Sequence, residues 1–404
     1  SGDDVVDAYP SSSDGDDQQG PCLCIEWEVP TDVGNEIQSD ALELSFQFAA
    51  EQERNNPDPD NPFVDVTVGP PGGSTSYEFN SVQAAINDSE TPAGGVISVA
   101  PNPDDYDEQV TLDKEDILLL STGGPSQTTL TDRVVVSADG ATLCGFTVSP
   151  PSPFDTSESE AIRVSDSADG VSIIDNVVEN FGREVRSSDT NFWGTDGINV
   201  FGGDKNDAIE DVTVRGNTVR NVYNADQGGS AGISIQGNVD GATVTNNTVK
   251  EIGVDPASGT PVNSYAFGVI IRGTGNHTVD PTNVNAVDND ISSVLASDDT
   301  DFLGVGFSVQ ASGTNYVTRD NTIDDVNIGV ELTGAATELN LAGNSISNID
   351  NSVNSTNNPG VPPLYLGDQT GNAPIATFIA ENSYDVAVKP DGPFGLYLQA
   401  IVPR

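Results

Sequence analysis

Basic side chains are scarce in this 404-residue sequence, in which 14 Lys and Arg residues, only four of them Lys, stand against 63 Asp and Glu residues. The formal net charge of −49 excludes nucleic acids, heparin-like polymers and anionic membrane surfaces as partners, because each would be repelled. An acid excess with few Lys side chains is typical of proteins that work at high salt, where charges are screened within about 3 Å at 1 M. We therefore expect a halophilic source.

Methionine is absent, and no apolar run reaches the roughly 18 residues that a membrane span requires. Without Met at position 1, we expect a mature chain, extracellular or at the cell surface, after removal of a signal peptide. We also expect no membrane insertion. Hydrophobic residues make up only 35% of the chain, yet they fall in repeated alternating patterns, which argues against a disordered chain.

Cysteine and histidine are nearly absent. Cys22 and Cys24 lie two apart on an expected strand and point to one face, so they cannot easily pair with each other. Together with Cys144 they make an odd number, which leaves at least one thiol outside an intramolecular disulfide, and the disulfide state of all three stays open. The single His277 offers no metal-ligand set. The acidic turn 58–61 is a candidate for Ca²⁺, but it lacks the glycine and distal Glu of a calcium loop, so we expect no cofactor.

Composition divides the chain into three segments. Residues 1–20 are small, polar and acidic, which predicts a flexible tail. Residues 21–66 form an N-terminal β segment, in which four apolar residues alternate with polar ones as in a half-buried strand: Leu42, Leu44, Phe46 and Phe48. Residues 67–404 start with a short amphipathic helix within 77–88, capped by Asn80 or Ser81, and continue as short strands.

Asparagine recurs at one register of a repeated β pattern. Each repeat has an alternating strand, a turn position and a second short apolar pair, with a further strand before the next repeat. The turn position holds Gly145 and then seven asparagines: Asn176, Asn217, Asn247, Asn289, Asn321, Asn344 and Asn382. We expect these asparagines to adopt the left-handed backbone conformation at a tight corner and to form a ladder of amide hydrogen bonds between stacked coils.

Such repeats predict an all-β solenoid of about ten coils, with strands stacked about 4.8 Å apart and with insertions of varying length in its loops. Over residues 75–400 the repeats resemble the right-handed parallel β-helix, or pectate-lyase-like, superfamily. The right-handedness is implied by that resemblance. The short helix before the first strands would cover the open end of the stack.

Most enzymes with the fold implied by this resemblance act on acidic polysaccharides. Polygalacturonase-type hydrolases carry Asn-Thr-Asp, an Asp pair, Gly-His-Gly and Arg-Ile-Lys. The Gly-Thr-Asp of residues 194–196 partly matches the first motif, and the other three are missing. Pectate lyases use an Arg base beside a calcium-binding acidic cluster, and we expect no acidic cluster around Arg163, Arg215 or Arg272.

Loop 182–196 is the segment richest in chemically active side chains. If the chain is an enzyme, its candidate catalytic residues are Asp189, Asp196, Asp204 and Arg183. Trp193 in the same loop could provide a platform for a sugar ring. The alternative is a long surface insertion whose Trp covers the edge of a coil.

Four Asn-x-Ser/Thr sequons are candidate glycosylation sites in an exported chain: Asn87, Asn246, Asn276 and Asn354.

The N-terminal β segment contains Trp-x-Val-Pro, an Asp-Val-Gly-Asn-Glu-Ile-Gln turn and Glu-Gln-x-Arg-Asn. These motifs resemble the closing strands of TasA/camelysin-type domains of exported haloarchaeal proteins, which implies a β-sandwich related to extracellular fibres, although the preceding strands are missing. We therefore predict an exported structural protein of a halophilic archaeon, a cell-surface or filament subunit that self-associates by strand addition, with surface glycans as further candidate partners. The alternative is a polysaccharide lyase or glycoside hydrolase acting in a groove of the β-helix. The second alternative is a carbohydrate-binding adhesin.

Overall fold

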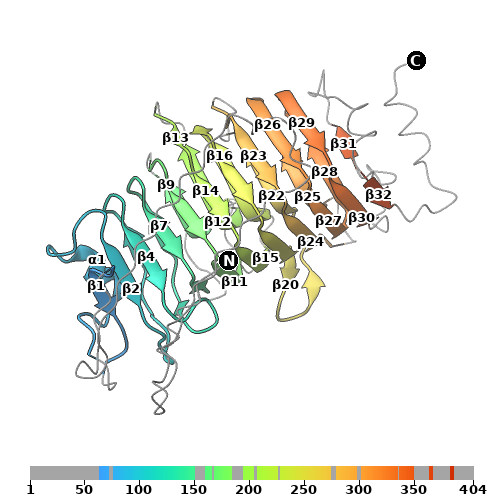
Figure 1. Cartoon of the computed structure of the whole chain (residues 1–404). Coiled ribbons are helices and arrows are strands. Elements are labelled where there is room, and N and C mark those ends of the chain that lie inside the picture. The colour runs from blue at the N-terminus through green and yellow to red at the C-terminus, as the bar shows by residue number, and fades with distance from the viewer. Residues whose placement is uncertain are drawn as a thin grey trace, which may run out of the picture. The chain divides into compact units, whose positions relative to one another are not determined.

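The computed structural model describes a stack of β coils (Figure 1). The described residues are 63–71, 76–150, 160–165, 168–183, 194–203, 207–225, 228–273, 279–297, 302–334, 336–349, 364–366 and 383–385. All of them belong to one unit, Glu53–Arg404. The tail 1–20 and most of the segment 21–66 lie outside the described residues, so these boundaries stay predictions.

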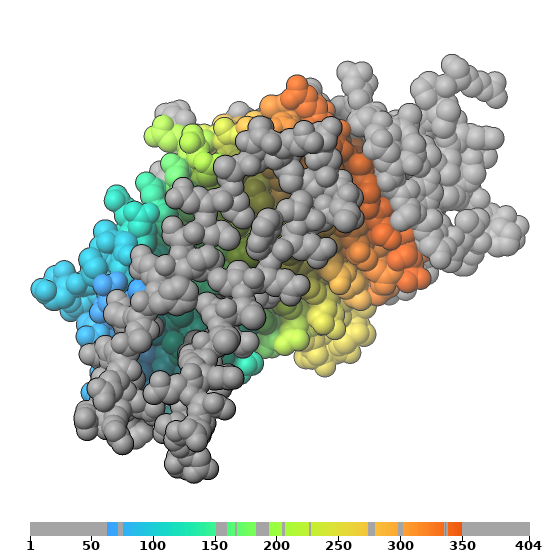
Figure 2. All heavy atoms as spheres, in the orientation of Figure 1, coloured from blue at the N-terminus to red at the C-terminus, as the bar shows by residue number. Residues whose placement is uncertain are grey.

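Three parallel sheets, here named A, B and C, form the faces of the stack, and from β4 to β31 the chain visits them in the repeating order A, B, C. Sheet A has ten strands, in agreement with the expected number of coils: β1 (Val66–Val68), β2 (Val96–Val99), β4 (Leu118–Ser121), β7 (Thr142–Cys144), β10 (Ser172–Ile174), β14 (Thr213–Arg215), β18 (Thr243–Thr245), β23 (Val284–Val287), β26 (Thr314–Arg319) and β29 (Thr337–Ala342). The described residues follow one another along the stack in chain order (Figure 2).

Sheets B and C each have nine strands among the described residues. Sheet B consists of β5 (Thr129–Leu130), β8 (Thr147–Val148), β11 (Val177–Arg183), β15 (Thr218–Asn224), β19 (Thr248–Ile252), β24 (Asp290–Val294), β27 (Thr322–Val326), β30 (Ser345–Ile349) and β32 (Ser383–Asp385). Sheet C consists of β3 (Val110–Leu112), β6 (Val134–Val136), β9 (Glu160–Ser165), β12 (Thr195–Gly203), β16 (Ser230–Gly237), β22 (Ala266–Arg272), β25 (Gly304–Val309), β28 (Ile328–Leu332) and β31 (Leu364–Leu366).

Two small pairs lie outside these sheets. Strands β13 (Ile209–Glu210) and β17 (Val239–Asp240) pair in parallel within the stack. Strands β20 (Val254–Asp255) and β21 (Thr260–Pro261) form an antiparallel hairpin that projects from it (Figure 1).

The core consists of columns in which similar apolar side chains stack on one another from coil to coil. One column in sheet B is β-branched throughout, in register, and at most 1% exposed: Val178, Val219, Val249, Ile291, Ile323 and Ile346. Burial of each such side chain contributes about 1.5–3 kcal/mol. Because every inner position has the same neighbours above and below, alternating strand sequences are sufficient to specify this core.

The predicted asparagine ladder is present from Asn176 to Asn344 (Asn382 lies outside the described residues). The side-chain amide of Asn176 donates to Oδ1 of Asn217 at 3.2 Å, and the contact repeats at 3.1 Å to Asn247 and 3.0 Å to Asn289. It then continues at 2.9 Å to Asn321 and at 2.9 Å to Asn344. Each of these asparagines is 0–2% exposed, so the ladder is an internal feature of the stack.

The expected backbone conformation was wrong by one residue. None of the ladder asparagines has a positive φ among the described residues, whereas the residue before each one does: Asp175, Gly216, Asn246, Asp288, Asp320 and Gly343. Gly145 is also left-handed, at φ 81°, and belongs with this preceding position. The residue of the first repeat that stands in the ladder register is Phe146, whose backbone N–H donates to Asn176 Oδ1 at 3.0 Å.

Helix α1 (Val82–Asn87) lies at the N-terminal end of the described stack, as expected. Its N-cap is Ser81, whose Oγ accepts from Ala84 N at 3.1 Å. Glu108, from the segment before β3, reaches the same helix end and accepts from Val82 N at 2.7 Å and from Gln83 N at 3.1 Å. A carboxylate is stabilising there, because the first turn of a helix has unsatisfied N–H groups.

Candidate functional site

The outer face of sheet C carries a polar network that includes side chains of β9, β12, β16 and β22. In β12, Ile198 and Val200 point into the core, so Asn199 points outward between them. Gly197 lies at a close approach, since a Cβ there would meet Val219 Cγ1 at 2.5 Å and Gly232 O at 2.7 Å. The strand therefore needs glycine at this position, immediately after Asp196.

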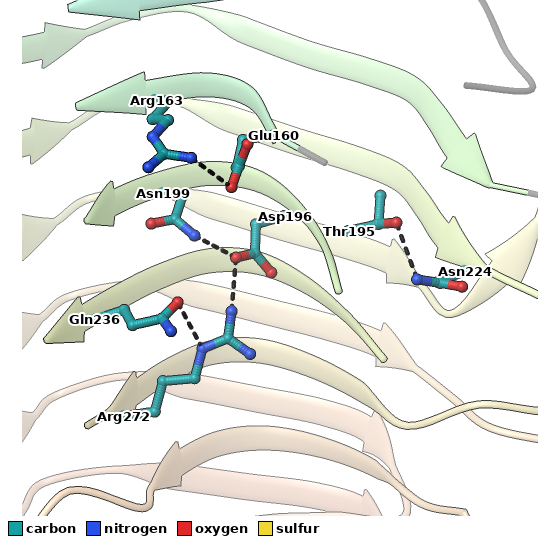
Figure 3. A network of polar contacts seen from close by, with 8 residues as sticks. All are labelled: Glu160, Arg163, Thr195, Asp196, Asn199, Asn224, Gln236 and Arg272. Atoms are coloured by element: carbon teal, nitrogen blue, oxygen red, sulfur yellow. Dashed lines mark hydrogen bonds and ion pairs between the residues drawn. The ribbon is translucent and has the colours of Figure 1, made fainter. Parts of the chain in front are cut away.

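Asp196 is the centre of the network (Figure 3). Its Oδ2 accepts from Asn199 Nδ2 in the same strand and from Arg272 Nη2 at 2.8 Å, two strands away on β22. Arg272 Nε also donates to Gln236 Oε1 on the intervening β16 at 3.2 Å. Asp196 is 3% exposed, and the Arg272 side chain is 25% exposed, so the guanidinium is the accessible end of the ion pair.

A second carboxylate stands beside the first. Glu160 on β9 pairs in register with Asp196, is 7% exposed, and forms an ion pair with Arg163 at 3.2 Å. The Arg163 guanidinium also lies 4.5 Å from the ring centroid of Phe201, a cation–π contact. Two adjacent strands thus each present a buried carboxylate held by an arginine on the same side of the sheet (Figure 3).

Three polar groups complete the site. Asn224 Nδ2 donates to Thr195 Oγ1 at 3.1 Å and fixes the chain where β12 begins. Asn199 Oδ1 and Ser234 Oγ are both buried without a hydrogen-bond partner. These residues are neighbours, since Asn199 and Ser234 pair in register between β12 and β16.

Of the four catalytic candidates from the sequence, the structure places Asp196 in this network. Asp189 and Asp204 lie outside the described residues. The backbone of Arg183 ends β11, in register with Asn224 of β15, while its side chain is not among those described. The grouping of these four residues therefore stays a prediction.

Two of the three arginines considered from the sequence each pair with a single carboxylate, Arg163 with Glu160 and Arg272 with Asp196. The sequence reasoning missed Asn199 and the role of Glu160. The sequence does indicate one contact of the network. When strands are aligned by their inner residues, Gln236 and Arg272 fall in one outer column, as they do for AIRVSD, GINVFG, AGISIQG and FGVIIRG.

The remaining candidate residues lie away from the Asp196 network or outside the described residues. Among the glycosylation candidates, Asn87 ends α1 and Asn246 occupies a left-handed corner, and both are exposed. Asn276 and Asn354 lie outside the described residues, as do Cys22, Cys24, His277 and the acidic turn 58–61. Cys144 ends β7 with intermediate exposure.

Within the described parts of the chain, His, Cys, Asp and Glu side chains do not gather in threes as a metal site would require. No helix found there has the length and apolar character to cross a membrane.

Comparison with solved structures finds several proteins with similar folds. The A-module of the mannuronan C-5 epimerase AlgE6 from Azotobacter vinelandii is 14% identical, with 72% of this chain and 77% of that chain covered and a TM-score of 0.39. The YbhC protein of Escherichia coli is 13% identical, with 85% and 88% covered and a TM-score of 0.37. The pectin methylesterase PemA from Erwinia chrysanthemi is 11% identical, with 67% and 80% covered and a TM-score of 0.29.

At these identities and TM-scores, the matches carry no argument about this chain. A search of curated proteins gives no match. The family model described as "Right handed beta helix region" matches residues 159–362, which is half of the chain and includes the whole Asp196 network. The chain therefore belongs to the right-handed β-helix family.

Proposed function

We propose that this chain is a glycoside hydrolase that acts on a neutral polysaccharide across the outer face of sheet C, with Asp196 and Glu160 as its carboxylate pair. The observation that supports this proposal is the in-register placement of two buried carboxylates on adjacent strands, each held by an arginine. The two side chains come from residues 36 positions apart, which only the stacking of coils brings together.

The separation of the two strands favours a retaining mechanism. Neighbouring strands lie about 4.8 Å apart. Retaining hydrolases hold their two carboxyl groups about 5–5.5 Å apart, whereas inverting hydrolases need about 6.5–9.5 Å to admit a water. Asp196, oriented by Asn199 and Arg272, would attack the anomeric carbon. Glu160, protonated and released from its ion pair with Arg163, would give its proton to the leaving oxygen. Water, deprotonated by Glu160, would then release the sugar from Asp196.

Hydrolysis fits this network better than elimination. A lyase base must accept a proton, and a guanidinium paired with a carboxylate keeps its own. Arg163 and Arg272 are both paired in this way. A neutral polymer is also a better substrate than a uronate polymer for a chain of net charge −49, because polyanions are repelled over the whole surface.

The test is incubation of the full chain, from low to multimolar salt, with dextran, xylan, glucomannan and mixed-linkage glucan, and with polygalacturonate and alginate for comparison. We expect new reducing ends from a neutral polymer, and losses of about 10²–10⁴-fold in Asp196→Asn and in Glu160→Gln. Asp290→Asn, an exposed Asp on β24, is the matched control and should retain full activity. Unsaturated products from the acidic polymers, or hydrolysis that survives Asp196→Asn, would refute the proposal.

The filament interpretation stays a prediction. It rests on the N-terminal β segment, nearly all of which lies outside the described residues. Export and a halophilic source likewise stay predictions, and both are compatible with an enzyme that meets its polymer outside the cell.

A further inference from the structure

An aromatic cluster lies at the start of β22. The rings of Tyr265 and Phe267 stack with centroids 6.1 Å apart, and Phe302 meets Tyr265 edge-on at 4.8 Å. Tyr265 is 41% exposed, and Phe63 is the other exposed large apolar side chain in the described part of the chain. An isolated exposed ring is ordinary on a protein surface, so the significance of Tyr265 depends on where its ring lies.

The cluster lies in line with the carboxylate pair. Phe267 pairs in register with Ala231 of β16, and Ala231 pairs with Asp196 of β12, so the three occupy one row across sheet C. Tyr265 is two residues before Phe267, and its ring stacks on that of Phe267, so both project from the same face. At about 4.8 Å per strand, the cluster lies roughly 10 Å from Asp196 along the axis of the stack.

The side chain between the two is small, because the intervening position is Ala231. Neighbouring positions on the same face carry polar side chains, Gln236 and Arg272, which stack in one column. An apolar ring flanked by hydrogen-bonding groups matches the two surfaces of a pyranose, which has C–H groups on its faces and hydroxyls at its rim.

We propose that Tyr265, held in place by Phe267 and Phe302, is a platform that binds one sugar ring of a neutral polysaccharide, two strands away from Asp196. The polymer then lies along the axis of the stack and crosses the strands of sheet C, instead of following a single coil. This inference rests on the proposed function for the identity of the polymer, but it concerns binding and can be tested without turnover.

The experiment measures binding by affinity electrophoresis in gels containing dextran, xylan, glucomannan or mixed-linkage glucan, with all variants in the Asp196→Asn background. Tyr265→Ala should weaken retardation by the polymer that the parent binds about tenfold in Kd, which corresponds to about 1.4 kcal/mol. Tyr265→Phe keeps the ring and should restore binding to within about twofold. Phe63→Ala, the matched control, should bind as the parent does.

In the active enzyme, Tyr265→Ala should raise KM for the polymer with kcat nearly unchanged, because the ring lies away from the reacting bond. Loss of binding in Tyr265→Ala with no hydrolysis of any polymer would support the platform and refute the hydrolase. Hydrolysis that depends on Asp196, with equal binding by the parent and Tyr265→Ala, would support the hydrolase and refute the platform. Absence of binding by the parent to all four neutral polymers would refute the platform.

Discussion

Asn247, in the middle of the asparagine ladder, can be removed by the substitution Asn247→Ala. Its Nδ2 donates to Val214 O at 2.9 Å and to Asn289 Oδ1 at 3.0 Å. Its Oδ1 accepts from Asn217 N at 2.9 Å and from Asn217 Nδ2 at 3.1 Å. All four hydrogen bonds are lost in the alanine variant, and the buried N–H of Asn217 is left without its acceptor.

At about 1 kcal/mol for each net hydrogen bond, the loss in the free energy of unfolding is roughly 4 kcal/mol. That is a large fraction of the roughly 5–15 kcal/mol that stabilises a typical folded protein. The control is Asn285→Ala, because Asn285 is an exposed asparagine on β23. Its replacement should change stability by less than about 0.5 kcal/mol.

The measurement is urea unfolding followed by far-ultraviolet circular dichroism, with the slope m compared between variants. We expect a lower midpoint for Asn247→Ala at unchanged m. Equal midpoints for Asn247→Ala and Asn285→Ala would show that the ladder contributes nothing beyond the sheet hydrogen bonds, and the energetic reasoning would then be wrong.

Three further predictions concern other parts of the stack. Glu108→Ala removes the carboxylate at the N-terminus of α1. Hydrogen exchange of the backbone amides in the first turn should accelerate by the equivalent of about 1 kcal/mol. Glu115 is exposed, and Glu115→Ala should leave this exchange unchanged. Burial raises the pKa of Tyr106 to about 12, so the phenol loses its proton at lower pH in the unfolded chain than in the folded one. The free energy of unfolding should therefore fall as pH rises from about 10 to 12. Alkaline unfolding should show a smaller fall for Tyr106→Phe. Gly232→Ala would place a Cβ 2.3 Å from a valine methyl group and should lower stability by about 1–3 kcal/mol, whereas Gly194→Ala meets nothing closer than 3.6 Å and should be tolerated in a thermal melt.

The sequence predicts the coil repeat well, because the ladder asparagines recur in a fixed relation to alternating strands. It does not reveal directly which residue of the turn takes the left-handed conformation, since asparagine suits both roles. The position before the ladder contains only Gly, Asp and Asn, which are the residues that tolerate positive φ: Gly145, Asp175, Gly216, Asn246, Asp288, Asp320 and Gly343. The ladder position requires asparagine for another reason, because its side-chain amide forms hydrogen bonds with backbone groups of a neighbouring coil.

The candidate site could not be read from the sequence in the same way, because its contacts depend on how coils of different lengths come into register. Asp196 and Arg272 are 76 residues apart, and the chain between them includes loops of varying length. An inner residue repeats in every coil, so its neighbours are known once the period is known. The type of an outer residue differs from coil to coil. Its neighbour can be identified only when the loop that contains each insertion is known. Glu160 and Asp196 show the consequence: each belongs to an ordinary strand, and only their shared register makes them a pair.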